Sequence, residues 1–262
     1  MLADHPGVRV SRVGDHVAEL VLDRPEAMNA VSTQQARSLA VATTALAADR
    51  SVRAVLVTSS SPKAFCVGAD LKERSAFTEA DLRAQRPVAR SAYRGFLDLP
   101  VPAIAVVAGY ALGGGFEIAL CCDLIVAEDS AVFALPEVSV GVIPGGGGTA
   151  LLTRRVGWNR AADLIFTCRR VDAAEGERLG FVDRRAAAGA GRAVGLSMAD
   201  TIAGHSPVGV RSAKRAMRRG LSLDLAAALE VEDAAWRATA YSPDRIEGVA
   251  AFNQKRRPVW PD

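Results

Sequence analysis

The sequence predicts an α/β protein with crossover connections between its strands, and two observations support this prediction. Short apolar runs, typical of strands that are covered on both faces, alternate with longer segments in which helix-forming residues have helical spacing. After about residue 195 the strand signals stop, and only helical patterns follow. We therefore expect an α/β core over residues 1–195 and a helical C-terminal region over residues 196–262.

The predicted strands are five runs rich in aliphatic and β-branched residues: residues 17–22, 54–58, 103–107, 124–127 and 131–135. The predicted helices are residues 33–48 and 79–97 in the core, and residues 206–219, 223–240 and 243–256 in the C-terminal region. Gly220 is a natural C-terminal cap, while Ser242, Pro243 and Asp244 form a strong helix start. Residues 184–195 are rich in Ala, Gly and Arg, and we expect them to be loosely ordered.

Composition narrows the classes of protein. With 262 residues the chain can bury a sizeable core, and its net charge of +3 suits an anionic ligand but is too small to argue for nucleic acid alone. The cysteines lie in apolar settings without metal-ligand spacing, so we expect reduced thiols, no metal site and no disulfide. Together with an N-terminus that lacks an apolar signal segment, this predicts a cytoplasmic protein.

One stretch, residues 99–122, is apolar and long enough to span a bilayer. It also contains two prolines, three consecutive glycines and Glu117, a pattern that indicates a strand, a glycine turn and a buried helix. We therefore expect no membrane segment.

The glycine turn is the first candidate site. Gly113, Gly114 and Gly115 open a predicted helix that is apolar except for Glu117. Backbone N–H groups at such a turn can bind a phosphate or stabilise an oxyanion, and a poorly solvated Glu117 must be paired or have a shifted pKa. The alternative for Glu117 is an ordinary acid in the first turn of a helix.

Two further segments have weaker signals. Gly68 stands among small residues before Asp70, a pattern that also fits an ordinary loop. Glu137 follows Pro136, which can open a helical turn, and an exposed first-turn acid is the alternative there. The four glycines at residues 145–148 form a second turn suited to an anion, but Thr149 is not preceded by Lys, which argues against a P-loop.

Five motifs, in order over nearly the whole chain, resemble those of the crotonase (enoyl-CoA hydratase/isomerase) family. They are residues 22–30 (LDRPEAMNA), 64–71 (AFCVGADL) with Glu73, 109–123 (GYALGGGFEIALCCD), 133–148 (FALPEVSVGVIPGGGG) and 247–258 (EGVAAFNQKRRP). The resemblance implies a spiral of β-β-α repeats with a helical C-terminal trimerisation region, as a trimer or a dimer of trimers.

The resemblance also implies an acyl-CoA substrate, of which coenzyme A is a part, and no tightly bound cofactor. Two backbone N–H groups, at the positions of Val67 and Gly114, would form the oxyanion hole. Further positions would contact the substrate or coenzyme A: Ala27, Met28, Ala64, Gly68, Ala69, Asp70, Leu71, Gly145, Phe252 and Lys255.

In the family that this sequence resembles, hydratases have a glutamate at each of two catalytic positions, and the matching residues here are Glu117 and Glu137. The resemblance therefore implies a hydratase, which adds water across the 2,3 double bond to give 3-hydroxyacyl-CoA. An alternative is a Δ3,Δ2-enoyl-CoA isomerase, which generally keeps only the acid at Glu137. A lesser alternative is a non-catalytic acyl-CoA- or RNA-binding homologue, because a basic face is predicted on one tail helix: Arg211, Lys214, Arg215, Arg218 and Arg219.

Three departures from the family pattern bear on the site and the fold. Val67 replaces the usual alanine, Glu26 stands where a basic residue is common, and Gly176 replaces a helical alanine at an expected cost of about 1 kcal/mol. The acyl chain and the pathway, whether fatty-acid, sterol or secondary metabolism, stay open at this stage.

Overall fold

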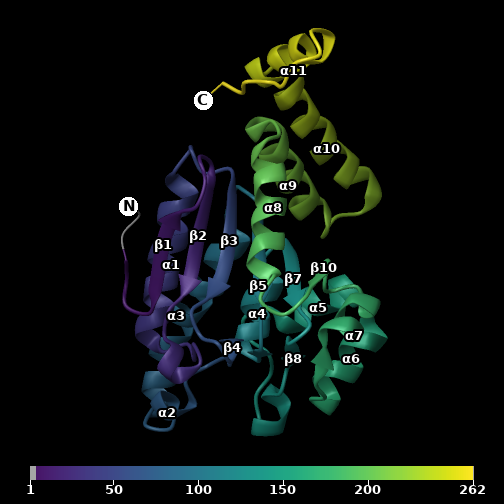
Figure 1. Cartoon of the computed structure of the whole chain (residues 1–262). Coiled ribbons are helices and arrows are strands. Elements are labelled where there is room, and N and C mark those ends of the chain that lie inside the picture. The colour runs from purple at the N-terminus through teal and green to yellow at the C-terminus, as the bar shows by residue number, and fades with distance from the viewer. Residues whose placement is uncertain (1–3, 262) are drawn as a thin grey trace.

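Strand–strand–helix units follow one another in a spiral, as Figure 1 shows for the computed structural model, which describes residues 4–261. In the central units the first strand joins a large sheet and the second joins a small one, whereas both strands that precede residue 33 belong to the large sheet. The large sheet has the order β1 (Val8–Arg12), β2 (Val17–Leu22), β3 (Ala54–Ser59), β5 (Ala103–Val107), β7 (Leu124–Glu128) and β10 (Arg184–Ala186). The small sheet has the order β4 (Ala64–Cys66), β6 (Tyr110–Leu112), β8 (Val132–Ala134) and β9 (Val171–Asp172).

Within residues 4–261 most neighbouring strands are parallel, and the β1–β2 and β8–β9 pairs are antiparallel. The helices of the core are α1 (Thr33–Ala48), α2 (Leu71–Arg74), α3 (Glu79–Leu97), α4 (Gly114–Cys121), α5 (Gly148–Val156), α6 (Trp158–Thr167), α7 (Ala173–Leu179) and α8 (Gly191–Ala203). Short 3₁₀ turns are η1 (Pro25–Ala27) and η2 (Glu137–Val140). This arrangement confirms the predicted α/β spiral of β-β-α repeats.

The central strands are buried on both faces, as their continuous apolar runs predicted. Leu56 on β3 points to a small core cluster under α8, while its neighbours Val55 and Val57 belong to the main core on the other face. Because a strand alternates its side chains, a run with no polar residue is needed to fill both clusters.

Two predictions about the end of the core are wrong. Residues 184–195 are not loose, because they form β10 and the start of α8. The boundary at residue 195 falls inside α8, which lies across the large sheet (Figure 1). Gly191 and Gly195 allow this close packing, since a Cβ at Gly195 would lie 2.7 Å from Val106 Cγ2. The helical extension from the core therefore begins after α8.

Gly176 in α7 is also explained by packing. A Cβ there would lie 2.8 Å from both Phe181 Cζ and Val182 Cγ2. Phe181 packs against Phe116 of α4, with ring centroids 5.0 Å apart. The cost expected for a helical glycine is therefore offset by the close approach of α7 to this aromatic cluster.

The helical tail consists of α9 (Pro207–Gly220), α10 (Leu225–Ala240) and α11 (Pro243–Asn253). The helix start predicted at Ser242 is confirmed, because the Ser242 side chain accepts from Arg245 N. Gly220 proves to be the last residue of α9, and Leu221 takes the cap position. Among the described residues, no helix is both long and apolar enough to cross a membrane.

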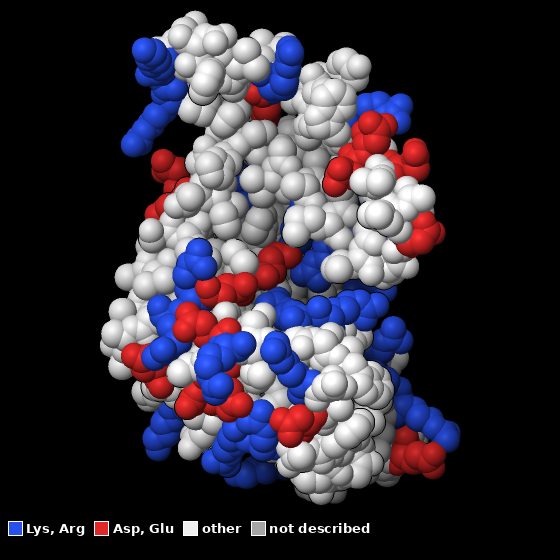
Figure 2. Space-filling view, turned by 90° about the vertical axis from the view of Figure 1, so that its right-hand side faces the viewer, with Lys and Arg blue, Asp and Glu red and all other residues white. Residues whose placement is uncertain are grey.

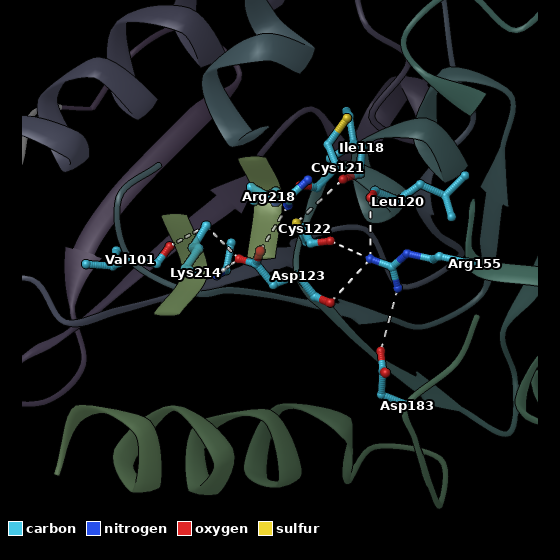
Figure 3. Close-up of polar contacts among 11 residues, drawn as sticks. Val101, Ile118, Leu120, Cys121, Cys122, Asp123, Arg155, Asp183, Lys214 and Arg218 are labelled. Carbon is cyan, nitrogen blue, oxygen red and sulfur yellow. Dashed lines mark hydrogen bonds and ion pairs between the residues drawn. The ribbon is translucent and has the colours of Figure 1, made fainter. Parts of the chain in front are cut away.

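Asp123 joins the tail to the core (Figure 3). Its carboxylate accepts from Lys214 Nζ at 2.7 Å and from Arg218 Nη2 at 2.9 Å, both on α9. Lys214 also donates to Val101 O, and its side chain is only 8% exposed. Arg211 donates to the carbonyls of Arg50 and Val52. Three of the five cations of the predicted basic face therefore hold α9 in place, which argues against a free nucleic-acid surface.

Figure 2 shows the side of the molecule that carries the tail. Charged side chains of both signs gather over its lower half, while the upper part is white in its middle and carries blue and red groups at its edges. The tail, residues 207–253, exposes large apolar side chains: Met217, Leu221, Leu225, Leu229, Trp236, Tyr241, Ile246 and Phe252. A surface of this kind usually marks an interface.

Candidate active site

The N-terminus of α4 is a turn that only glycine can form. Gly113 has φ +50°, and a Cβ there would lie 2.8 Å from Glu137 Oε1. Gly114 is the first helical residue, so its N–H has no acceptor within the helix, and it has none elsewhere among the described residues. This N–H and the positive end of α4 are available to an anionic oxygen.

Glu117 lies one turn into α4 and is 3% exposed. Its Oε1 accepts from Gly146 N at 2.6 Å and from Gly148 N at 2.7 Å. Gly148 begins α5, so the carboxylate lies at a second helix N-terminus. Burial raises the pKa of Glu117, and the hydrogen bonds from Gly148 and Gly146 oppose that rise without cancelling it.

Glu137 stands at the start of η2 and reaches toward the same turn. Its Oε1 lies against Gly113, and its Oε2 is buried without a hydrogen-bond partner among the described residues. Burial raises the pKa of Glu137 to about 7, and the charge of Glu117 adds to the rise. The two carboxylates are thus electrostatically coupled beside Gly113 and Gly114, and a buried oxygen without a partner can take a water or a substrate.

The backbone at residues 66–69 requires a correction to the predicted oxyanion hole. The Val67 N–H donates to Met28 O at 3.2 Å, so this donor is already used. The Ala69 N–H has no acceptor among the described residues. Gly68, with φ +91°, packs directly on Gly114, since a Cβ on Gly114 would lie 3.4 Å from Gly68 Cα. Ala69 therefore offers the free donor beside Gly114 that Val67 was expected to provide.

The first two motifs lie against each other, as expected for one binding surface. Arg24 Nη1 donates to Asp70 Oδ2 at 2.6 Å and to Ala30 O at 2.9 Å. The same Asp70 carboxylate caps α2 through Lys72 N and Glu73 N. Among the described residues, the ion-pair partner of Glu26 is Arg24, at 3.6 Å. Asp70 therefore holds two loops together, and a direct contact with the cofactor is not needed to explain its position.

The other predicted contact residues differ in access. Met28 is 39% exposed and has φ +50°, and Leu71 is 62% exposed, so both can meet a ligand. Ala27 lies beside Met28 in η1, and Gly145 lies beside the glycines that hold Glu117. Ala64 is fully buried and its carbonyl accepts from Ser59 Oγ, which contradicts a contact through its side chain.

The tail residues do not reach this site within one chain. Phe252, on α11, is 83% exposed, and Lys255 follows it at φ +53°. Figure 1 shows α11 at the opposite end of the molecule from α2 and β4. Phe252 and Lys255 therefore lie away from the site of their own chain, because α10 carries α11 away from the core, and the prediction that they help cover a site stays a prediction.

Sequence patterns missed the partners of Glu117. The run at residues 145–148 was predicted to bind an anion, and the anion it holds is the protein's own Glu117 carboxylate. Tyr93 was also missed: its hydroxyl would lie 2.4 Å from a Cβ on Gly114, and its ring 2.6 Å from one on Gly146. No local pattern could reveal this residue, since the long helix α3 brings it to the site.

The comparisons with known proteins agree with this geometry. A family model described as enoyl-CoA hydratase/isomerase matches residues 12–262. The chain belongs to this family. It is 38% identical over 252 residues to a probable mitochondrial enoyl-CoA hydratase 2 of Arabidopsis thaliana, covering 96% of this chain and 84% of the relative. It is 37% identical to the mitochondrial methylglutaconyl-CoA hydratase of Mus musculus, covering 93% and 79%.

A solved structure shows the same fold. The enoyl-CoA hydratase of Bacillus anthracis superposes with a TM-score of 0.95 at 35% identity, covering 97% of this chain and 98% of that one. Family membership supports an acyl-CoA substrate and an enzyme of the hydratase type.

Proposed function

We propose that the protein is an enoyl-CoA hydratase, a hydro-lyase that adds water across the 2,3 double bond of an enoyl-CoA thioester to give 3-hydroxyacyl-CoA. The observation that carries the proposal is the pair of coupled carboxylates, Glu117 and Glu137, beside the free N–H of Gly114. A site with two acids and an oxyanion donor has every group that this reaction needs.

The thioester carbonyl would lie between the N–H groups of Gly114 and Ala69. Addition of water to a conjugated thioester places negative charge on this oxygen in the transition state. Fixed donors aimed at that oxygen stabilise the charge, and loss of one donor typically costs about 10²–10³ in rate. The positive end of α4 acts in the same direction.

The two acids would have different tasks because their surroundings differ. Glu117 accepts two backbone hydrogen bonds through Oε1, which oppose the rise that burial causes in its pKa and leave Oε2 to hold and deprotonate the attacking water. Glu137 has a pKa of about 7, so it can carry a proton at neutral pH and deliver it to the α-carbon. The bond to water forms at the β-carbon, and the electron pair of the double bond takes the proton from Glu137.

A second candidate is a Δ3,Δ2-enoyl-CoA isomerase. The observation in its favour is Glu137 itself, because one acid with a pKa near neutrality can remove and return a proton without water. Isomerisation by Glu137 alone would give the oriented Glu117 carboxylate no role, and this favours hydration over isomerisation.

The test measures both reactions on one preparation. Wild-type protein is expected to hydrate crotonyl-CoA, followed by loss of the enoyl-thioester absorbance, faster than it isomerises a 3-enoyl-CoA. Glu117→Gln and Glu137→Gln should each lower the hydration kcat by about 10²–10⁴ while a saturated acyl-CoA still binds. Hydration at the wild-type rate in either variant would remove that residue from the mechanism.

We also propose that the protein works as a trimer, or as a dimer of trimers, in the cytoplasm. The exposed apolar side chains of α9 and α10 line a groove of about 660 Å³, which supports association through the tail. Phe252 and Lys255 would then reach the site of a neighbouring copy, since they lie far from their own. Sedimentation should give the mass of three or six chains, and a monomer would contradict the proposal.

A further inference from the structure

A second pocket lies behind the glycine loop that holds Glu117. It has a volume of about 530 Å³, between α3 and the segment that leads into α5. The side chains and backbone that matter here are Arg86, Arg90 and Tyr93 from α3, and Gly145 and Gly146 from the loop. The mechanism proposed above uses none of the charged groups in this pocket.

Two of the three arginines that line this pocket, Arg86 and Arg90, lack acidic partners among the described residues. Arg86 and Arg90 are one helical turn apart, and no carboxylate of the described residues lies within ion-pair distance of either. Their neighbours on α3 are paired, because Arg83 contacts Glu79 and Arg94 contacts Asp98. Asp98 is the one acid among the lining residues, and Arg94 already occupies it.

Such an arrangement is unfavourable for the protein alone. Like charges at i and i+4 on a helix repel each other and destabilise it. Two guanidinium groups beside a cavity would be compensated by an anion that enters it. Because a guanidinium donates two parallel hydrogen bonds, a carboxylate is the anion that its geometry suits well.

The pocket shares a wall with the reaction site. Arg86 Nη2 donates to Gly145 O at 2.8 Å, and the next residue, Gly146, donates its N–H to Glu117. The Arg86 charge is close enough to Glu117 to lower the pKa of that carboxyl against the effect of burial. Tyr93 lines the pocket with its ring, while its hydroxyl lies against Gly114. Tyr93 and Gly146 thus lie between this pocket and the groups at Gly114 and Glu117.

We propose that Arg86 and Arg90 form a carboxylate-binding subsite, so that the preferred substrate is a short enoyl-CoA with a carboxylate at the end far from the thioester. This inference rests on the proposed hydratase function and names its substrate class. A plain aliphatic chain would enter the same pocket without meeting a partner for either arginine.

The test compares substrates that differ in the distal carboxylate. Glutaconyl-CoA is crotonyl-CoA with a carboxylate on its terminal carbon, and 2-hexenoyl-CoA is a neutral control for length. Wild-type protein should have the highest kcat/KM for glutaconyl-CoA. Arg90→Gln should reduce the ratio of its kcat/KM to that for crotonyl-CoA by about 10- to 100-fold, the usual effect of losing a hydrogen bond to a charged group. Arg86→Gln should act in the same direction, although it also frees the loop carbonyl.

Arg83→Gln is the matched control, because Arg83 lies on the same helix and pairs with Glu79. It should leave the substrate ratio unchanged. Equal ratios in wild type, Arg83→Gln and Arg90→Gln would overturn the subsite, even if crotonyl-CoA is hydrated well.

A binding experiment separates this inference from the hydratase proposal. Glutaryl-CoA and butyryl-CoA are saturated, so neither can be hydrated, and calorimetry measures their binding alone. Tighter binding of glutaryl-CoA that is lost in Arg90→Gln supports the subsite, even if no hydration is found. Equal binding of the two compounds by wild type overturns it.

Discussion

The two ends of α4 differ in whether their terminal backbone groups have hydrogen-bond partners. At the C-terminus, each of the last four carbonyl groups has a donor: Ile118 O from Cys122 Sγ, Ala119 O from Cys122 N, Leu120 O from Arg155 and Cys121 O from Arg218. Figure 3 shows the arginines converging there. At the N-terminus, only the Glu117 N–H has an acceptor among the described residues, Gly113 O. The closed end fixes the helix, and the open end is left for a ligand.

This difference has a physical reason. A buried helix end without partners costs free energy, so a protein leaves one open only where something else binds. The closed end takes cations from α5 and α9, which complement the negative end of the helix dipole. Damage at the two ends should therefore have different effects: loss of stability at one and loss of rate at the other.

The largest effect is expected at the closed end. Asp123→Asn leaves Lys214 as a buried cation with no ionised partner, and should lower the free energy of unfolding by about 3 kcal/mol. Denaturant titration measures this loss. Below the unfolding transition, kcat/KM should stay near the wild-type value.

The control for this variant is Asp98→Asn, which breaks the exposed Arg94–Asp98 pair and should cost less than about 1 kcal/mol. Replacing Lys214 by Met in the Asp123→Asn background should restore part of the stability. If the double variant is no more stable than the single one, the buried charge is not the cause.

At the open end, Gly114→Ala should cost about 10² in kcat, because a displacement of about 1 Å is enough to misplace a catalytic group. The new Cβ would meet the Tyr93 hydroxyl at 2.4 Å, while the next ring atom, Cζ, is at 3.5 Å. Tyr93→Phe removes only that oxygen, so the double variant should regain most of the rate. Steady-state kinetics on crotonyl-CoA decide this, and an equally slow double variant would contradict the steric explanation.

The acid that faces the open end predicts a pH effect. Glu137 must carry a proton to act as the acid, so kcat/KM should fall about tenfold per pH unit above its pKa of about 7. Glu137→Gln should lose this alkaline limb along with most of its rate. If kcat/KM of Glu137→Gln still falls at high pH, the titration of another group causes that fall.

Stability should respond to the same group in a defined direction. The pKa of Glu137 is raised in the folded protein, so its contribution is fully present below the ordinary value of 4.5 and is lost as pH rises through about 7. The difference in unfolding free energy between wild type and Glu137→Gln should change within this window. A difference that is flat with pH would rule out the raised pKa.

The sequence predicted the segments with strong local patterns and missed those that depend on neighbours. The helices at residues 33–48 and 79–97 are confirmed to the residue, because both have helical spacing and clear ends. The short strands β4, β6 and β9 were not predicted, since two or three residues carry no period of their own. The first residues of α8, up to Gly195, were predicted to belong to a loose segment because several of them are small, but packing on the large sheet stabilises this helix.

The same contrast holds for the site. Glu117, Glu137 and Gly114 could be identified because glycine runs and isolated acids are local signals. Choosing between Val67 and Ala69 as a donor required knowledge of where each N–H points, and that depends on the carbonyl of Met28 from another loop. Tyr93 and Arg86 stand on a helix of ordinary composition, so only the folded chain shows their place.

The glycines around Glu117 also limit where the substrate selectivity of the protein can be changed. Gly113, Gly146 and Gly148 face neighbouring side-chain atoms at distances that leave no space for a methyl group. The opposite wall is made of long side chains on an exposed face of α3, where Arg90 has no hydrogen bond to that backbone among the described residues, whereas Arg86 donates to Gly145 O. Libraries aimed at new acyl groups should therefore vary α3 and keep the loop as it is.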